Sequence, residues 1–415
     1  RSPGAARLLG RRAAIEARLE GYSVDGFRVL AVASRGIAVQ DSYHRDDERD
    51  LELNGFLLFH DPPKPGVSEA LSALAQQGVR VKMITGDNVH VARHLAERVG
   101  LPVAGVLTGA ELASMKDEAL WNRAIETDIF AEVDPNEKER VILALKKMGQ
   151  VVGYLGDGIN DAPALHAADV SISVDSAVDV AKEAADFVLL RPDLDMLRQG
   201  IVAGRRTFAN TLKYVLTTTS ANLGNMVSMA VASVALPFFP LTAGQILLNN
   251  FLSDIPALGI ANDTVDAEWV EKPQRWDMRL IRRFMLRFGL LSSAFDLATF
   301  AVLYWGFRVG AETFQTGWFV ESLLTELAVA LVVRTRRPAL KSRPGTLLLW
   351  STVGVAVLAI AIPYLPYVSA FGFVPLPVPI LLAVLGITTA YVLATEALKR
   401  RFYRGLTTST ALPRS

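Results

Sequence analysis

The sequence predicts two regions of different fold: an α/β region with a parallel sheet over residues 51–205, and after it an all-α region of six transmembrane helices. Two observations lead to this prediction. Strand and helix signals alternate in the first half, which is typical of a parallel sheet with helices on both faces. Nearly all long apolar runs fall within residues 208–398, and the chain as a whole is 51% hydrophobic, which is more than a soluble protein of this size usually contains.

Hydrophobic periodicity predicts the elements of the first half in order. A basic amphipathic helix is expected at 6–20, and strands at 27–33 and 51–59. Four pairs, each a helix and the strand that follows it, are then expected at 67–78 and 79–84, 88–99 and 104–107, 136–148 and 150–155, and 161–167 and 169–173. Sheets of this kind bind their ligands outside the carboxyl ends of the strands.

The second half contains six apolar stretches close to the length of roughly 17–25 residues that a bilayer requires. They are predicted at 213–236, 240–261, 284–307, 317–334, 346–366 and 377–397. Most of the Lys and Arg in the connections lies on alternate sides of these stretches. By the positive-inside rule, both termini and the α/β region are expected in the cytosol, with the chain crossing the plasma (inner) membrane several times.

Composition excludes several classes of function. The net charge of +1 does not indicate nucleic-acid binding. The chain has no cysteine, which excludes disulfides, zinc–thiolate sites and thiol catalysis. It begins with Arg1 and carries no signal segment, so we expect it to be part of a longer protein.

Polar segments follow two of the predicted strands directly. Thr85-Gly86-Asp87-Asn88 follows VKMI, and the run Gly156–Pro163 (GDGINDAP) follows VVGYL. A hydroxyl and backbone amides after a strand can hold phosphoryl oxygens, and glycines let the main chain approach them. A lysine at the start of a neighbouring helix, such as Lys138, can neutralise charge on a transferring group.

The paired carboxylates Asp157 and Asp161 suit Mg²⁺, which bridges carboxylate and phosphoryl oxygens. The alternative is that these segments are only turns that cap helices. That alternative stays open for Thr85-Gly86-Asp87 taken alone. It does not account for an Asn and two Asp residues packed between glycines and a proline in Gly156–Leu165.

GDGINDAPAL, together with MITGDN and DPPK (Asp61–Lys64), resembles the phosphorylation-domain and hinge motifs of P-type ATPases. The resemblance covers essentially the whole chain and implies a haloacid dehalogenase-like phosphorylation domain that uses ATP and Mg²⁺. It implies these roles: phosphoryl contacts for Thr85, Gly86 and Asp87, phosphate stabilisation for Lys138, and a catalytic Mg²⁺ site of Asp157, Asn160 and Asp161. Arg28 in GFRVLAVA looks like an arginine that helps to hold ATP, or else is a solvated strand-edge arginine.

The resemblance also divides the chain and indicates what it lacks. It implies a remnant of the nucleotide-binding domain at 1–50, the phosphorylation domain at 51–205, the transmembrane domain at 206–404 and a cytosolic tail at 405–415. The family's DKTGT nucleophile and its TGE motif are absent. Thr108-Gly109-Ala110-Glu111 only looks like the TGE motif, because it lies within the sequence of the phosphorylation domain. We therefore expect a sheet without its nucleophile strand, and a chain that is inactive without the N-terminal half of the pump.

Polar residues inside a bilayer are costly and therefore functional candidates. Asn222 and Asn225 share a helix face, and so do Asn250, Ser253 and Asp254. Such oxygens form a plausible partial cage for a hard cation, although interhelical hydrogen bonding is an alternative. The resemblance to the fifth and sixth helices of these pumps implies that Asn222, Asn250 and Asp254 bind the ion, and that Asn225 stands where calcium pumps commonly carry Glu.

Two more carboxylates, Asp296 and Glu326, either join the ion path or pair with neighbouring polar groups. The stretches LGIANDTVDAEWVEKPQRWD and FQTGWFVESLLTELAVALVVRTRRP resemble bacterial magnesium-transporting P-type ATPases. This implies ATP-driven import of Mg²⁺ across a lipid bilayer, and the lack of cysteine argues against a heavy-metal pump. Glu326 departs from that subfamily and leaves a calcium or proton-coupled role open.

Two other functions remain as alternatives. A half-pump without its nucleophile could act as a partner or regulator of a complete pump. A haloacid dehalogenase-like phosphatase joined to a membrane anchor would share the Lys and Asp-pair chemistry. It would still need a nucleophilic aspartate after the first strand, and Asp61 is followed by two prolines.

Overall fold

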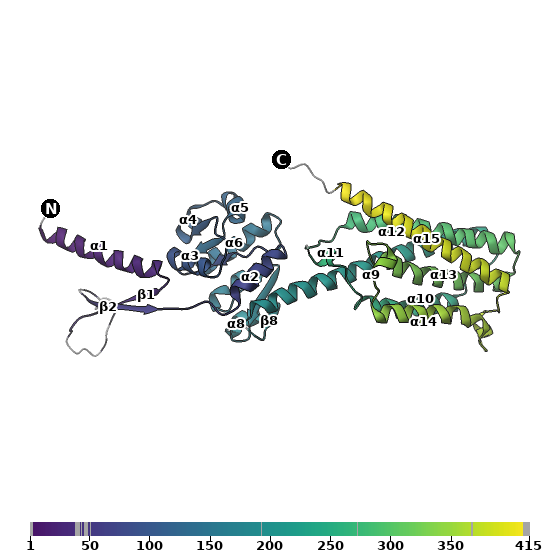
Figure 1. Ribbon diagram of the computed structural model, residues 1–415, viewed down its shortest axis with the longest axis horizontal. Helices are drawn as coiled ribbons and strands as arrows, with labels where there is room; N and C mark the ends of the chain where they lie inside the picture. Colours follow the sequence, from purple (N-terminus) through teal and green to yellow (C-terminus); the bar gives the residue numbers. More distant parts are fainter. Residues whose placement is uncertain are drawn as a thin grey trace. The chain divides into compact units, whose positions relative to one another are not determined.

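The computed structural model describes residues 3–37, 42, 44, 49, 51–191, 193–271, 273–366 and 368–409. The chain divides into two compact units, Arg1–Ile201 and Val202–Ser415 (Figure 1). Residues 410–415 of the predicted tail lie outside the described residues. Each unit is described by itself.

The first unit opens with a helix and two strands, as predicted, and the two strands pair as a hairpin. Helix α1 (Pro3–Val24) precedes β1 (Arg28–Ser34), which pairs antiparallel with β2 (Glu52–Phe59). Gly26, between α1 and β1, has a φ of +85°, and a Cβ there would lie 2.3 Å from the His94 ring. Only glycine meets both demands, because it has no side chain and tolerates positive φ.

The rest of this unit alternates strands and helices. The strands are β3 (Met83–Ile84), β4 (Val106–Thr108), β5 (Ile129–Ala131), β6 (Gly153–Leu155), β7 (Val170–Val174) and β8 (Phe187–Leu189). The helices are α2 (Val67–Gln76), α3 (Val89–Arg98), α4 (Gly109–Ser114), α5 (Asp117–Glu126), α6 (Pro135–Lys147), α7 (Ala162–Ala167) and α8 (Asp179–Glu183). The predicted strand–helix order is confirmed, while α4, α5, β5, α8 and β8 were not predicted.

All strand pairs after the hairpin are parallel, as predicted, but they form two sheets and not one. The strand orders are β3-β5-β4 and β6-β7-β8. The two motif-bearing strands, β3 and β6, are therefore edge strands, each paired with one strand among the described residues. Both sheets nevertheless contribute to one hydrophobic core, since Leu107 and Phe130 of the first sheet cluster with Tyr154 of the second and with Val141 of α6.

The second unit is helical. Its main helices are α9 (Leu194–Ala235, which begins before the boundary between the units), α10 (Ala243–Ile260), α12 (Met278–Phe300), α13 (Ala311–Val333), α14 (Thr346–Ala361) and α15 (Val378–Ser409), with the short α11 (Ala267–Val270) after α10. A π-helical turn at Ala301–Gly306 extends α12. In Figure 1 the helices α10, α12, α13, α14 and α15 run alongside one another, and the contacts between helices agree.

Four stretches of the described residues are long and apolar enough to cross a membrane: Met278–Gly306, Ala311–Val333, Thr346–Tyr364 and Val378–Arg404. They correspond to the third to sixth predicted spans. The first two predicted spans are helical, within α9 and α10, and both helices are long enough, but they are less apolar than these four stretches. In α10, Gln245, Asn249, Asn250 and Asp254 lower the mean hydropathy. Six spans therefore remain a prediction.

Helix α13 lies at the centre of this unit. It contacts α10, α12, α14 and α15, and Trp318, Phe319 and Leu323 on it are almost completely buried in the unit's largest hydrophobic cluster. A helix that is covered on all sides can be apolar all round, so the polar residues that α13 does carry stand out.

Candidate functional site

The loop that follows β3 is held by hydrogen bonds to its own residues and to the end of β5. The Thr85 hydroxyl accepts from the Asp87 amide at 3.1 Å and donates to the Asp87 carboxylate at 3.2 Å. The amide of Val133 donates to the Thr85 carbonyl at 3.2 Å, and that of Glu132 to the Asp87 carbonyl at 2.9 Å. The predicted Thr85-Gly86-Asp87 segment is thus an ordered loop at the carboxyl edge of the sheet.

Glu132 carries backbone strain at this junction. Its φ of +58° lies in the left-handed region, which is uncommon for a residue with a side chain and costs of the order of 1–3 kcal/mol. The hydrogen bond from its amide to Asp87 and a 3.4 Å hydrogen bond from the Val89 amide to its carboxylate hold it there. Strain of this kind persists where the surrounding structure fixes the backbone.

Lys138 reaches the second motif from the first turn of α6. Asp134 caps this helix in a reciprocal capping box with Glu137, and Pro135 opens it, which is a typical helix start. The Lys138 ammonium lies 2.8 Å from Oδ1 of Asp161, and the two side chains are 13% and 12% exposed. Because the loop that precedes α6 is bonded to Thr85-Gly86-Asp87, this ion pair connects both motifs.

Asp161 uses both of its oxygens in hydrogen bonds. Besides Lys138, the Tyr154 hydroxyl donates to Oδ1 at 2.8 Å. The amides of Asp157 and Gly158 donate to Oδ2 at 3.2 and 3.1 Å. These hydrogen bonds let Asp161 fix both the loop and the lysine, and its role as a Mg²⁺ ligand stays a prediction.

The electrostatics of Asp161 follow from these contacts. Burial alone raises its pKa, but the hydrogen bonds from Lys138, Tyr154 and the Gly158 amide outweigh burial and hold the pKa below its ordinary value of 3.8. Burial, reinforced by the hydrogen bond to this carboxylate, raises the pKa of Tyr154. At neutral pH Asp161 is therefore a carboxylate, which accepts hydrogen bonds from the Lys138 side chain and the Tyr154 phenol.

The other predicted residues of this motif face solvent. Asp157 and Asn160 are exposed, so the Asp157 carboxylate is open to a hard cation, which prefers oxygen ligands. Nowhere in the described ranges do three or more His, Asp or Glu side chains group together as metal ligands. Asp157 is thus suited to bind Mg²⁺, and the other ligands of the ion would be supplied by other groups.

Arg28 is brought to the first motif. Its Nε lies 3.8 Å from Oδ1 of Asp87, in an ion pair exposed to solvent. The Asp61–Lys64 segment is irregular chain between β2 and α2 and is mostly exposed. Thr108 and Glu111 form a capping box at the start of α4, which gives that TGAE sequence a purely structural explanation.

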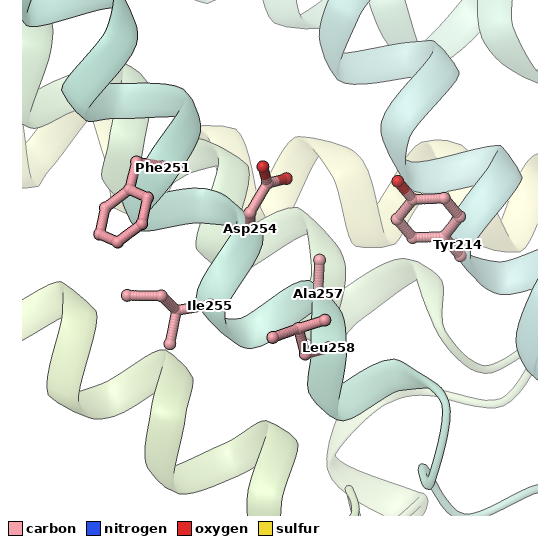
Figure 2. A pocket seen from close by; sticks show the side chains of 6 residues that line it. All are labelled: Tyr214, Phe251, Asp254, Ile255, Ala257 and Leu258. Atoms are coloured by element: carbon pink, nitrogen blue, oxygen red, sulfur yellow. The ribbon is translucent and has the colours of Figure 1, made fainter.

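The predicted membrane ligands lie on the outer faces of α9 and α10. Asn222, Asn250 and Asp254 are exposed and Asn225 is partly buried. Among the described residues no hydrogen bond joins the two asparagines of α9 to the polar face of α10. Asp254 lines a pocket of about 460 Å³ that is otherwise mostly apolar. Figure 2 shows Asp254 on α10 and Tyr214 on α9 at opposite sides of it.

The two additional membrane carboxylates have neighbours. Asp296 is 2% exposed and accepts hydrogen bonds from the Ser228 hydroxyl at 2.6 Å and from the Trp318 indole at 3.1 Å. Glu326 lies beside Ser253 and within electrostatic range of Asp254. The alternative that Asp296 pairs with neighbouring polar groups is therefore confirmed, and Glu326 adds a carboxyl group beside the predicted ion ligands of α10.

Sequence reasoning missed three features. Tyr154 was detectable only as an inward-facing residue two positions before the GDGIND motif. Glu321, a fully buried acid of α13, fell inside a predicted span and met the rule that had selected Asp296. The third is a buried cluster at Asp263, whose carboxylate binds the Lys213 ammonium at 2.7 Å, the Arg334 guanidinium at 3.3 Å and the Gly345 amide at 2.7 Å.

Comparisons with known proteins agree with both units. The family model described as haloacid dehalogenase-like hydrolase matches residues 6–169, and the one described as cation transporting ATPase, C-terminus, matches residues 238–401. The magnesium-transporting ATPase, P-type 1, of Escherichia coli K12 is 43% identical over 385 residues, which is 91% of this chain. This chain belongs to the P-type cation-transporting ATPase family.

Other members of the family are also similar. A magnesium-transporting ATPase, P-type 1, of Salmonella typhimurium is 41% identical over 95% of this chain and 44% of the relative. Calcium-transporting ATPase 1 of Saccharomyces cerevisiae is 36% identical over 62% of this chain and 27% of the relative. The chain spans less than half the length of these relatives, 43% for the Escherichia coli protein.

Proposed function

We propose that this chain is the C-terminal part of an ATP-driven pump that imports Mg²⁺ through an aspartyl-phosphate intermediate. The observation that carries the proposal is the Lys138–Asp161 ion pair at the end of β6, beside an exposed Asp157. This arrangement offers a cation and an open carboxylate at the carboxyl edge of the sheets, where a phosphoryl group would bind. The 41–43% identity to proteins named magnesium-transporting supports the choice of ion.

In this proposal each residue of the first unit has a definite task. Lys138, oriented by Asp161, neutralises charge on the phosphoryl group, and the Thr85-Gly86-Asp87 loop binds its oxygens. Asp157 holds Mg²⁺, which when bound polarises the phosphoryl oxygens as a Lewis acid. The 415 residues contain no DKTGT sequence, so the proposal assigns the phosphorylated aspartate to a longer protein of which this chain is a part.

For the transported ion, the proposal uses the polar faces of α9 and α10. Asn222, Asn225 and Asn250 offer amide oxygens, and Asp254 offers a carboxylate. Glu326 beside Ser253 supplies a second carboxyl group in the same neighbourhood, and this specific observation favours a calcium pump as the second candidate. Two carboxylates suit Ca²⁺, which takes more ligands than Mg²⁺ and tolerates less regular geometry.

Cation-stimulated ATP hydrolysis by the longer protein tests this proposal. We expect stimulation by Mg²⁺ that is lost in Asp254→Asn, because the variant removes the only charged ligand on α10. Glu312→Gln is the matched control, since Glu312 is an exposed acid at the start of α13. If Ca²⁺ stimulates hydrolysis and this stimulation requires both Asp254 and Glu326, the transported ion is calcium and not magnesium. Unchanged Mg²⁺ stimulation in Asp254→Asn would refute this ion site.

The charge pattern supports an orientation as well. By the positive-inside rule, the basic connections on one side of the spans favour a cytosolic location for both termini, with the pump in the plasma membrane. Cysteine labelling from outside tests this orientation, because the chain has no native cysteine. A cysteine introduced at Phe239, in the uncharged connection between α9 and α10, should be labelled by an impermeant reagent. A cysteine at Arg191, after β8 in the first unit, should not be labelled, and the reverse pattern would contradict the orientation.

A further inference from the structure

Two carboxyl groups meet inside the helical unit, and the described residues place no cationic side chain in an ion pair with them. Asp296 of α12 is 2% exposed and Glu321 of α13 is completely buried, and the two carboxyl groups lie close enough to interact. Over the described part of the chain, no Lys, Arg or His forms an ion pair with either. A buried acid usually has a cationic partner or several donors, so this pair needs an explanation.

The hydrogen bonds around the pair are unequal. Asp296 receives one donor on each oxygen, from the Ser228 hydroxyl at 2.6 Å and from the Trp318 indole at 3.1 Å. Neither oxygen of Glu321 has a donor among the described residues. Within those same residues, the polar group that faces Glu321 is the carboxyl group of Asp296, and an ionised carboxylate cannot donate a hydrogen bond.

The groups farther out add no positive charge. Among the described residues, Glu326, on the same helix as Glu321, and Tyr391 of α15 interact electrostatically with members of the pair. One is an acid and the other a phenol. Two like charges that share a buried site repel strongly, so only one of the two carboxyls can be ionised.

We propose that Asp296 and Glu321 form a proton-binding site within the helical unit, in which Glu321 carries the proton and donates a hydrogen bond to Asp296. The assignment follows from the donors: Ser228 and Trp318 both point at Asp296 and mark it as the ionised acceptor. Glu321 accepts no hydrogen bond from the described residues, and a proton on its carboxyl group lets it form one as the donor to Asp296. The ligand of this site is thus a proton and not a metal ion.

The site joins three helices. Ser228 belongs to α9, Asp296 to α12, and Glu321 and Trp318 to α13. Ser228 lies one turn from Asn225 on α9. A shift of α9 along its axis would therefore remove one donor from Asp296 and change how firmly the proton is held. This gives the proton site a physical connection to the helix that carries the proposed ion ligands.

Infrared spectroscopy of the full chain in detergent tests the proposal. A protonated carboxylic acid has a carbonyl stretching band, sensitive to D₂O, that carboxylates lack. We expect this band near neutral pH in the unchanged chain and its loss in Glu321→Gln, which keeps a neutral donor for Asp296. Glu312→Gln, the exposed control on α13, should leave the band in place. The proposal is wrong if Glu321→Gln removes no such band.

A second variant and a titration complete the test. Trp318→Phe removes one donor from Asp296 without touching either acid, and should shift the band while retaining it; an unchanged band would contradict the proposed geometry. Addition of Mg²⁺ or Ca²⁺ should leave the band unaltered, whereas its disappearance would show that the pair takes a metal ion. These measurements involve neither ATP hydrolysis nor transport, so the proton site and the pump can fail independently.

Discussion

Replacement of Lys138 by alanine probes the contact on which the proposed phosphate site depends. It leaves the Asp161 carboxylate 12% exposed, without its counter-ion but with its three other donors: the Tyr154 hydroxyl and the amides of Asp157 and Gly158. Loss of one partner from a buried ion pair typically costs about 3–5 kcal/mol. Because three donors remain and the pair is not fully buried, we expect a loss of about 2 kcal/mol in the free energy of unfolding of the first unit.

Urea unfolding followed by brief proteolysis of the full chain measures this loss. A double-mutant cycle with Asp161→Asn isolates the pair, and most of the cost should appear as coupling energy between the two positions. Arg123→Ala is the control: Arg123 and Glu126 form an exposed pair at 3.8 Å in the same unit, for which we expect less than about 0.5 kcal/mol. If Lys138→Ala costs no more than this control, the ion pair does not organise the site.

Three further outcomes are expected. The pKa of Asp161 lies below 3.8, so the stability that this carboxylate contributes is present above pH 3.8 and is lost as pH falls through its folded-state pKa. The difference in urea midpoint between the unchanged chain and Asp161→Asn should therefore shrink as pH falls through that range. A difference that stays constant with pH would contradict this. A Cβ at Gly156 would lie 2.6 Å from that of Asp161, so Gly156→Ala should cost about 1–3 kcal/mol in the same assay, whereas Gly153→Ala, whose Cβ would meet nothing closer than 3.8 Å, should cost less. Asp263→Asn leaves Lys213 buried without its carboxylate and should lower thermal stability in detergent by about 3 kcal/mol, with partial recovery when Lys213→Met is added; a stable single variant would refute this.

The succession of elements was predictable because each element carries its own periodicity. The strands at 150–155 and 169–173 and the helix at 136–148 correspond to β6, β7 and α6. Strand β5 escaped detection because three buried residues, Ile129–Ala131, are too few to show alternation. The division into two sheets was not predictable from these patterns either, since hydrophobic periodicity does not encode which strands pair.

The positions of the two motifs of the proposed phosphate site were predictable, but the contacts between their side chains were not. The Thr85-Gly86-Asp87 and Gly156–Asp161 segments each follow a strand directly, so each lies at the carboxyl edge of its own sheet. The sequence could not reveal that Asp161 accepts hydrogen bonds from four donors, because Lys138 and Tyr154 come close to it only when the chain is folded.

The membrane residues show the same limit. Helical spacing put Asn250 and Asp254 on one face, but which face is covered depends on neighbouring helices, and both residues are exposed. The partner of Asp296 also comes from another helix. Glu321 is 25 positions away in the sequence, and no local pattern relates the two.

Formation of an acid-stable phosphoenzyme tests the account most directly. The longer protein, incubated with ATP labelled on the γ-phosphate and then denatured in acid, should retain label on an aspartate, and the label should turn over more slowly in Lys138→Ala and Asp157→Asn. The 415-residue chain alone should remain unlabelled under the same conditions. Absence of label from the longer protein, or label on this chain by itself, would contradict the proposed division of the catalytic site.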